Sequence, residues 1–108
     1  MTTDETFRQA GVDIEHYFGA REYAKKACIP AGVVLTQHQH LFSHLSILSS
    51  GRALVTVDGV ATEYGPNACI LIDAGATHSV QALTDVVWFC IHGTDNKNPD
   101  TVDAGLIQ

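Results

Sequence analysis

The feature of this sequence that most constrains its fold is a series of short segments rich in β-branched and aromatic residues. From Arg21 onward these segments follow one another closely, and most are about five to eight residues long, the usual length of a strand in an all-β domain. The segments cover residues 21–29, 31–40, 44–51, 52–59, 60–65, 68–73, 78–83 and 85–93. Their number and even spacing predict an all-β sandwich or barrel.

Turn residues separate these segments. Asp58-Gly59 lies between two alternating runs and predicts a tight hairpin, because a type I′ turn needs positive φ at both central residues. Gly51-Arg52 and Gly65-Pro66-Asn67 mark two further turns. We therefore expect one domain, with residues 1–20 as an N-terminal extension, 21–93 as the barrel and 94–108 as a polar tail that lies over the barrel or is irregular. Thr2 to Ala10 could form a short helix that Gly11 ends.

Charge and composition exclude several partners. The net charge is −6 and only 6 of 108 residues are Lys or Arg, so the chain lacks the basic clusters that bind nucleic acid or an anionic membrane. No apolar run approaches the roughly 20 residues of a membrane span, and the polar N-terminus does not resemble a signal peptide. Cys28, Cys69 and Cys90 are widely spaced, which favours three buried, reduced thiols. These observations predict a cytoplasmic protein.

Histidine carries the functional signal, with three of the six histidines in the segment HQHLFSH. His38 and His40 are two residues apart, so in a strand their side chains point to the same face. His44 follows after a connection just long enough to begin the next antiparallel strand, which would place it beside the first pair, and His78 opens a later segment. Clustered neutral imidazoles are common ligands of transition metals, so this spacing favours a metal site over surface histidines.

The same residues resemble the two sequence motifs of the cupin family. Gly32, His38, His40, His44 and Gly51 reproduce every spacing of the first motif, with His44 in place of the usual glutamate. The second motif is matched from Gly65 through the turn 73–75 to His78, with Asp73 replacing a proline and Ala82 an asparagine. The segments 44–59 and 86–95 are also similar to small cupins of bacteriophage genomes, from which no function follows.

The resemblance implies a jelly-roll barrel with one divalent ion, Mn, Fe, Zn or Ni, on His38, His40, His44 and His78. Four protein ligands on an octahedral ion leave two open positions, as in a catalytic site. Because a full ligand set is present, the resemblance favours a metal-dependent enzyme that acts on a small oxygenated or anionic molecule, either a dioxygenase-like oxygenase or an isomerase or lyase. The alternative is a non-catalytic module or scaffold that binds a sugar or small anion. No catalytic residue is assigned. Small cupins often pair, so we expect a homodimer, with residues 21–29 as the open edge that meets the second chain.

Other candidate residues have simpler interpretations. His92 ends the last segment and is expected at the rim, and His16 is expected at the surface. Trp88 and Phe89 are neighbours, so only one can face inward, where core packing is its expected role. Glu63 and Asp73 are the acidic residues nearest the motifs, and neither is assigned as a general base.

Overall fold

The computed structural model describes residues 11–37 and 42–102 and contains only strands within them. The prediction of an all-β protein is therefore confirmed. The nine strands are β1 (Asp13–Phe18), β2 (Glu22–Ile29), β3 (Val34–Gln37), β4 (His44–Ser50), β5 (Ala53–Val57), β6 (Val60–Tyr64), β7 (Ala68–Ile72), β8 (His78–Ala82) and β9 (Val86–Gly93). In this described part of the chain, no helix is long and apolar enough to cross a membrane.

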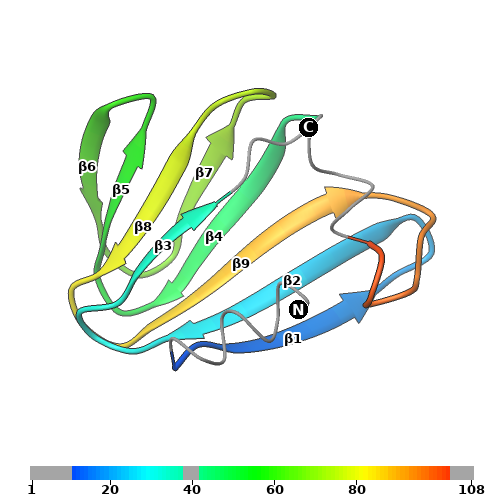
Figure 1. Cartoon of the computed structure of the whole chain (residues 1–108), viewed down its shortest axis with the longest axis horizontal. Helices are drawn as coiled ribbons and strands as arrows, with labels where there is room; N and C mark the ends of the chain where they lie inside the picture. The colour runs from blue at the N-terminus through cyan, green and yellow to red at the C-terminus, as the bar shows by residue number, and fades with distance from the viewer. Residues whose placement is uncertain (1–10, 38–41, 103–108) are drawn as a thin grey trace.

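The strands form two antiparallel sheets that face each other (Figure 1). The larger sheet has the order β1-β2-β9-β4-β7, and the smaller has the order β3-β8-β5-β6. Strands that are consecutive in sequence repeatedly lie in opposite sheets, as in a jelly roll. This topology brings β9, at the end of the barrel segment, between β2 and β4 in the centre of the larger sheet.

The Asp58-Gly59 turn joins β5 to β6 as the sequence predicts. The φ angles are 47° at Asp58 and 84° at Gly59, so both central residues have the positive φ of a type I′ turn. Asp58 also reaches the loop before β8, because its backbone N–H donates to the Thr77 carbonyl and its carboxylate accepts from the Thr77 N–H, each at 2.9 Å. The hairpin is thereby fixed to the residue that precedes His78.

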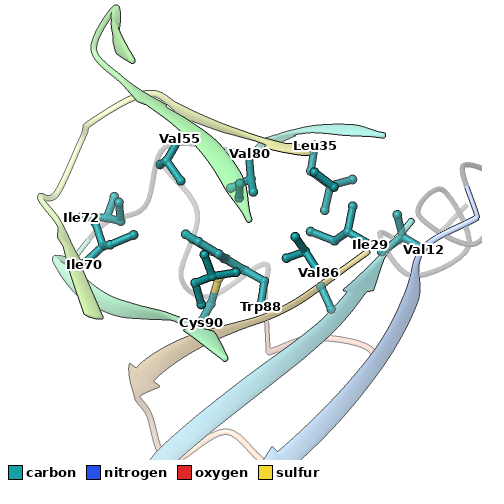
Figure 2. Packing of buried hydrophobic residues seen from close by; sticks show 14 of the residues in the cluster. Val12, Ile29, Leu35, Val55, Ile70, Ile72, Val80, Val86, Trp88 and Cys90 are labelled. Carbon is teal, nitrogen blue, oxygen red and sulfur yellow. The ribbon is translucent and has the colours of Figure 1, made fainter. Parts of the chain in front are cut away.

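The core lies between the two sheets and follows from the alternation of side chains along each strand. On β9 the inward residues Val86, Trp88, Cys90 and His92 are buried, while the residues between them face the other way. Trp88 is fully buried and lies across from Val55 and Val80 of the smaller sheet (Figure 2). The expectation that only one of Trp88 and Phe89 faces inward, as a core residue, is confirmed.

Three expectations about strand neighbours differ from the structure. β1 lies within the segment that was treated as an extension, and it pairs with β2 along its whole length. β2 is consequently paired on both sides, with β1 and β9, so the prediction that residues 21–29 offer an open edge is wrong. The strand that follows the histidine connection, β4, lies in the other sheet from β3 and is not its antiparallel neighbour. The predicted helix at residues 2–10 lies outside the described residues.

The described part of the tail lies against the larger sheet. Thr94 N–H donates to the Arg21 carbonyl at 3.0 Å, and side chains of Asn96 and Asn98 accept from backbone N–H groups two residues further on, as in Asx turns. The tail then buries Val102 against Tyr23 of β2, so it covers part of the inner face.

The three cysteines are free thiols, but they are not all buried. Cys90 is buried, Cys28 is partly buried and Cys69 is exposed. The prediction of three buried thiols is therefore wrong for Cys69, because it occupies an outward position on the edge strand β7.

The turn at Gly51 gives the first prediction. A Cβ at this position would lie 2.1 Å from the Asp85 carbonyl oxygen, and φ is +85°, so Gly51→Ala combines a backbone clash with an unfavourable φ. Gly59 has nearly the same φ but open space around it. We expect Gly59→Ala to lower the free energy of unfolding by about 1 kcal/mol and Gly51→Ala by about 3 kcal/mol or more. Urea denaturation of both variants measures the difference, and equal losses would contradict the clash.

Candidate metal centre

Three histidines from three strands meet at one end of the barrel interior. His44 begins β4, His78 begins β8 and His92 is the last buried residue of β9. Their exposed fractions are only 4%, 1% and 5%. The predictions that His44 and His78 open strands are confirmed, and β4 and β8 bring them together from opposite sheets.

The backbone register explains how these side chains meet. In the β4–β9 ladder Leu45 is opposite Ile91, and continuing the antiparallel register by one residue brings His44 level with His92. Their rings are stacked with centroids 4.3 Å apart. The ring of His78 reaches across the barrel to within 5.8 Å of His44, centroid to centroid, with the planes tilted by 50°.

His38 and His40 lie outside the described residues. The described backbone stops at Gln37, which is paired with His78 in the β3–β8 ladder. β3 therefore ends beside His78. Within residues 11–37 and 42–102, no group of three His, Cys, Asp or Glu side chains is placed so that it could hold a metal ion.

His92 is a site residue that the sequence analysis placed at the rim. It is buried because the larger sheet extends past the barrel, and because Tyr23 of β2 lies beside it with its ring 6.2 Å away. The signal for this position was the period of two in β9, which puts His92 on the same face as Trp88 and Cys90.

A row of rings continues from His92 towards the edge of the sheet. Tyr23 is fully buried and stacks with Phe18 at 5.2 Å and with His16 at 5.6 Å, centroid to centroid. The Tyr23 hydroxyl and His16 Nδ1 are hydrogen-bonded at 2.6 Å. His16 was expected at the surface, but it is half-buried and bonded to the residue that supports His92.

The polar groups on the neighbouring inward positions are neutral. Ser46 lies next to His44 on the inward face of β4, and its hydroxyl donates to the Cys90 thiol at 3.7 Å. Glu63 is exposed and pairs with Arg52, and Asp73 is exposed as well. Neither of the two acidic residues named from the sequence therefore lies among the buried histidines.

A groove of about 280 Å³ lies at the other end of the strands. It is lined by Cys28, Pro30, Ser50, Asp85 and neighbouring residues, and none of the four histidines that the structure describes lines it. The histidine cluster is thus separate from this groove.

The chemistry of the buried side chains suits a divalent transition-metal ion, although the described histidines alone are not placed as a three-ligand group. Imidazole nitrogen is a ligand that Zn, Fe, Ni and Cu all accept, and burial of the rings keeps competing water away from the donor atoms. The described residues supply imidazoles from both sheets, and β3 leads into the segment that holds two more.

Two facing antiparallel sheets with buried histidines at one end define a jelly-roll protein with a candidate metal centre. A family model described as a cupin domain matches residues 26–92, so the chain belongs to the cupin family. This confirms the resemblance seen in the two motifs. No curated protein sequence matches the chain.

Solved structures with the same fold include proteins of different kinds. KdgF from Halomonas sp. superposes with a TM-score of 0.70 at 13% identity, over 81% of this chain and 82% of that one. An RmlC-like cupin from Shewanella frigidimarina gives 0.69 at 19% identity, over 82% and 80%. Salicylate 1,2-dioxygenase from Pseudoaminobacter salicylatoxidans, in adducts with gentisate, gives 0.70 at 13% identity, over 82% of this chain but 28% of that one. At these identities the similarity establishes the fold.

The contact between His44 and His92 gives the second prediction. We expect His92→Ala to shift the ring proton resonances of His44 in metal-free protein, because it removes the stacked ring at 4.3 Å. His92→Phe keeps an aromatic ring in the same place, so the ring proton resonances of His44 should change less than in His92→Ala. Histidine-selective NMR spectra of the two variants and the wild type measure this, and an unchanged His44 signal in His92→Ala would contradict the stacked arrangement.

Proposed function

We propose that this cupin binds one divalent transition-metal ion through His38, His40, His44 and His78 and acts on a small oxygenated or anionic molecule at that ion. The observation that carries the proposal is the burial of His44 and His78 together at one end of the barrel, from opposite sheets. The pairing of Gln37 with His78 supports the remaining two ligands, because it directs the chain towards the site immediately before His38.

A bound divalent ion would supply Lewis acidity and two open positions for a ligand. Four neutral imidazoles leave its double charge uncompensated, which favours a carboxylate, an enolate or another anionic oxygen ligand. His44 occupies the position of the glutamate in the family motif, so this position has no carboxylate that could accept a proton.

Trp88 lies in the core on the inward face of β9, two inward positions before His92. Trp88 contributes a buried indole N–H on the same strand face as His92, and its nitrogen has no hydrogen-bond partner among the described residues. A buried donor without an acceptor costs about 1–3 kcal/mol, so an oxygen atom of a ligand or an ordered water near it would be stabilised.

The neutral character of the described inward residues favours a reaction at the ion over proton abstraction by a side chain. This supports a metal-dependent enzyme of the oxygenase type more than an isomerase or lyase, which needs a base. The alternative function is non-catalytic binding of a sugar or small anion. It is favoured by the same observation, because neither Glu63 nor Asp73 lies near the histidines.

Elemental analysis with native mass spectrometry of protein purified without chelators tests the proposal directly. One metal ion per chain supports it, and metal-free protein that binds none of Mn, Fe, Ni or Zn would overturn it. Oxygen consumption by the Fe- or Mn-loaded protein with small phenolic acids, keto acids or diketones then separates the oxygenase from the binding module.

The ligand assignment gives the third prediction. Each of the single substitutions His38→Ala, His40→Ala and His78→Ala should weaken metal binding by at least about 100-fold, because these three histidines are proposed as the three facial ligands. His44→Ala should weaken it less, since water can occupy the position that the family fills with a carboxylate. Chelator-competition titrations at pH 7.5 measure the four dissociation constants.

His44→Glu and His16→Ala are the controls for this series. His44→Glu restores the ligand of the family motif and should retain the ion, with a higher relative affinity for Mn(II) because carboxylate oxygen is a harder donor. His16→Ala removes a histidine of β1, which β2 separates from His92 on β9, and should leave affinity unchanged. If all four ligand variants bind as tightly as the wild type, the histidines are not ligands.

The fourth prediction concerns pH. A protonated imidazole has no lone pair for a metal, so binding should release protons and weaken as the pH falls through the range in which histidine titrates, near 6.5 in model peptides. We expect metal binding at pH 7.5 and its loss at pH 5. The same competition titration measures this, and equal affinity at the two pH values would contradict an all-histidine ligand set.

A further inference from the structure

Lys25 of β2 points to the inner face of the larger sheet. Successive residues of a strand alternate between its two sides, and Tyr23 and Ala27, two positions before and after Lys25, are buried on the inner side. Lys26 points in the opposite direction and pairs with the exposed carboxylate of Glu15 at 3.9 Å. Two adjacent lysines therefore lie on opposite faces of the same sheet.

The register of the ladders places Lys25 beside the histidine cluster. β9 lies between β2 and β4 (Figure 1), and it pairs Lys25 with Cys90, which is two residues before His92. Cys90 is opposite Ser46 of β4, which is two residues after His44. The Cα atoms of Lys25 and His44 are thus separated by roughly 7 Å along the strands and roughly 10 Å across the sheet.

Apart from histidine, Lys25 is the only charged residue at an inward position of the described strands. Its half-buried side chain carries an ammonium group, with three N–H donors and no acceptor. The neighbouring Ser46 hydroxyl and Cys90 thiol are uncharged and are hydrogen-bonded to each other at 3.7 Å. An ammonium group repels a metal ion held by the histidines but attracts an anion that this ion binds. The position of Lys25 therefore favours an anionic ligand.

We propose that Lys25 binds a second anionic group of the ligand, so that the molecule held at the histidine cluster is a short dicarboxylate. One end of this molecule occupies the open positions of the proposed metal ion, and the carboxylate at its other end accepts hydrogen bonds from the Lys25 ammonium group. This inference rests on the proposed metal site and narrows the class of its ligand. The ion alone would bind many small oxygen ligands, whereas Lys25 distinguishes a dianion from a monoanion.

The net charge of the protein gives this local charge its importance. At −6 the chain as a whole repels dianions, so a dianion is attracted only where positive charge is concentrated. Lys26 and Arg52 do not supply such a place, because they pair with Glu15 and Glu63 at the outer surface. The proposed ion and Lys25 supply positive charge at two points of one inner face, and a ligand charged at both ends matches both points.

The residues beside Lys25 are held in place by their own contacts. His16 of β1 is opposite Lys25, and its Nδ1 is hydrogen-bonded to the Tyr23 hydroxyl at 2.6 Å. Tyr23 stacks in turn with His92. A ligand that joins the ion to Lys25 has to be short, because β2 and β4 are only roughly 10 Å apart and side chains from both strands occupy part of that distance.

Binding of two matched acids to metal-loaded protein tests the proposal. 2-Oxoglutarate and 2-oxopentanoate share the 2-oxo acid group that chelates a metal ion and have carbon chains of equal length, but only 2-oxoglutarate ends in a second carboxylate. We expect the Zn(II)-loaded wild type to bind 2-oxoglutarate at least about 10-fold more tightly, because a hydrogen bond to a charged group stabilises the complex more than contact with a methyl group. Isothermal titration calorimetry measures both dissociation constants.

Lys25→Met and Lys26→Met are the matched variants. Each removes one positive charge and keeps an unbranched side chain, but only Lys25 lies on the inner face. We expect Lys25→Met to abolish the preference for 2-oxoglutarate with little change in the affinity for 2-oxopentanoate, and Lys26→Met to keep the wild-type preference. Circular dichroism spectra confirm that both variants are folded.

Chemical labelling of the wild type gives a second readout. Bound 2-oxoglutarate should slow the acetylation of Lys25 by acetic anhydride and leave that of Lys26 unchanged, because only the first ammonium group is covered by the ligand. 2-Oxopentanoate should protect neither lysine. Tandem mass spectrometry distinguishes the two adjacent sites.

Other results would overturn the assignment of Lys25. These are equal affinity of the wild type for the two acids, an equal loss of preference in Lys25→Met and Lys26→Met, or no protection of Lys25 from acetylation. In each of these cases the protein still binds the metal ion, so the proposed metal site stands. A wild type that binds no metal ion contradicts the proposed function itself, and this inference with it.

Discussion

Both surfaces of the larger sheet depend on the alternation of side chains along its strands, fixed by the backbone hydrogen bonds of β9 with β2 and β4. In this register His92 faces His44, Trp88 faces Leu48 and Ala27, and Phe89 lies outside with Ile47. A slip of one residue would turn the histidines outward and bury the outer apolar row in their place. The hydrophobic core and the fully buried Trp88 oppose such a slip, so the packing that stabilises the fold also determines which residues form the site.

Much of this arrangement could be read from the sequence because it depends on local chemistry. The Asp58-Gly59 turn, the strand starts at His44 and His78 and the inward position of Trp88 each follow from turn geometry or from a period of two. The spacings of the two motifs identified the family, which the match over residues 26–92 establishes. The cluster of His44 and His78 was predicted through that resemblance. These two histidines are 34 residues apart in the sequence, and local sequence patterns do not show that strands so far apart will meet.

The remaining features depend on contacts between distant strands. Whether a segment is an edge or a central strand is decided by what lies beside it, so β2 could not be distinguished from an edge before β1 was known to pair with it. His92 was misplaced for a related reason. Its position at the end of a segment suggests a rim, and only the extension of β1 and β2 beyond the barrel, together with Tyr23, covers it.

Asp58 meets two structural requirements at once. It adopts a positive φ in the β5–β6 turn, and its carboxylate and backbone N–H hold Thr77, the residue directly before His78. Glycine would adopt the positive φ and keep the backbone N–H bond to Thr77 but would lose the side-chain acceptor, and glutamate has a longer side chain and tolerates positive φ less well. Asparagine has both the tolerance of left-handed φ and a short side-chain oxygen. Natural variation at this hairpin tip should therefore be limited to aspartate and asparagine, even though the tip is exposed and distant in sequence from the histidine that it helps to place.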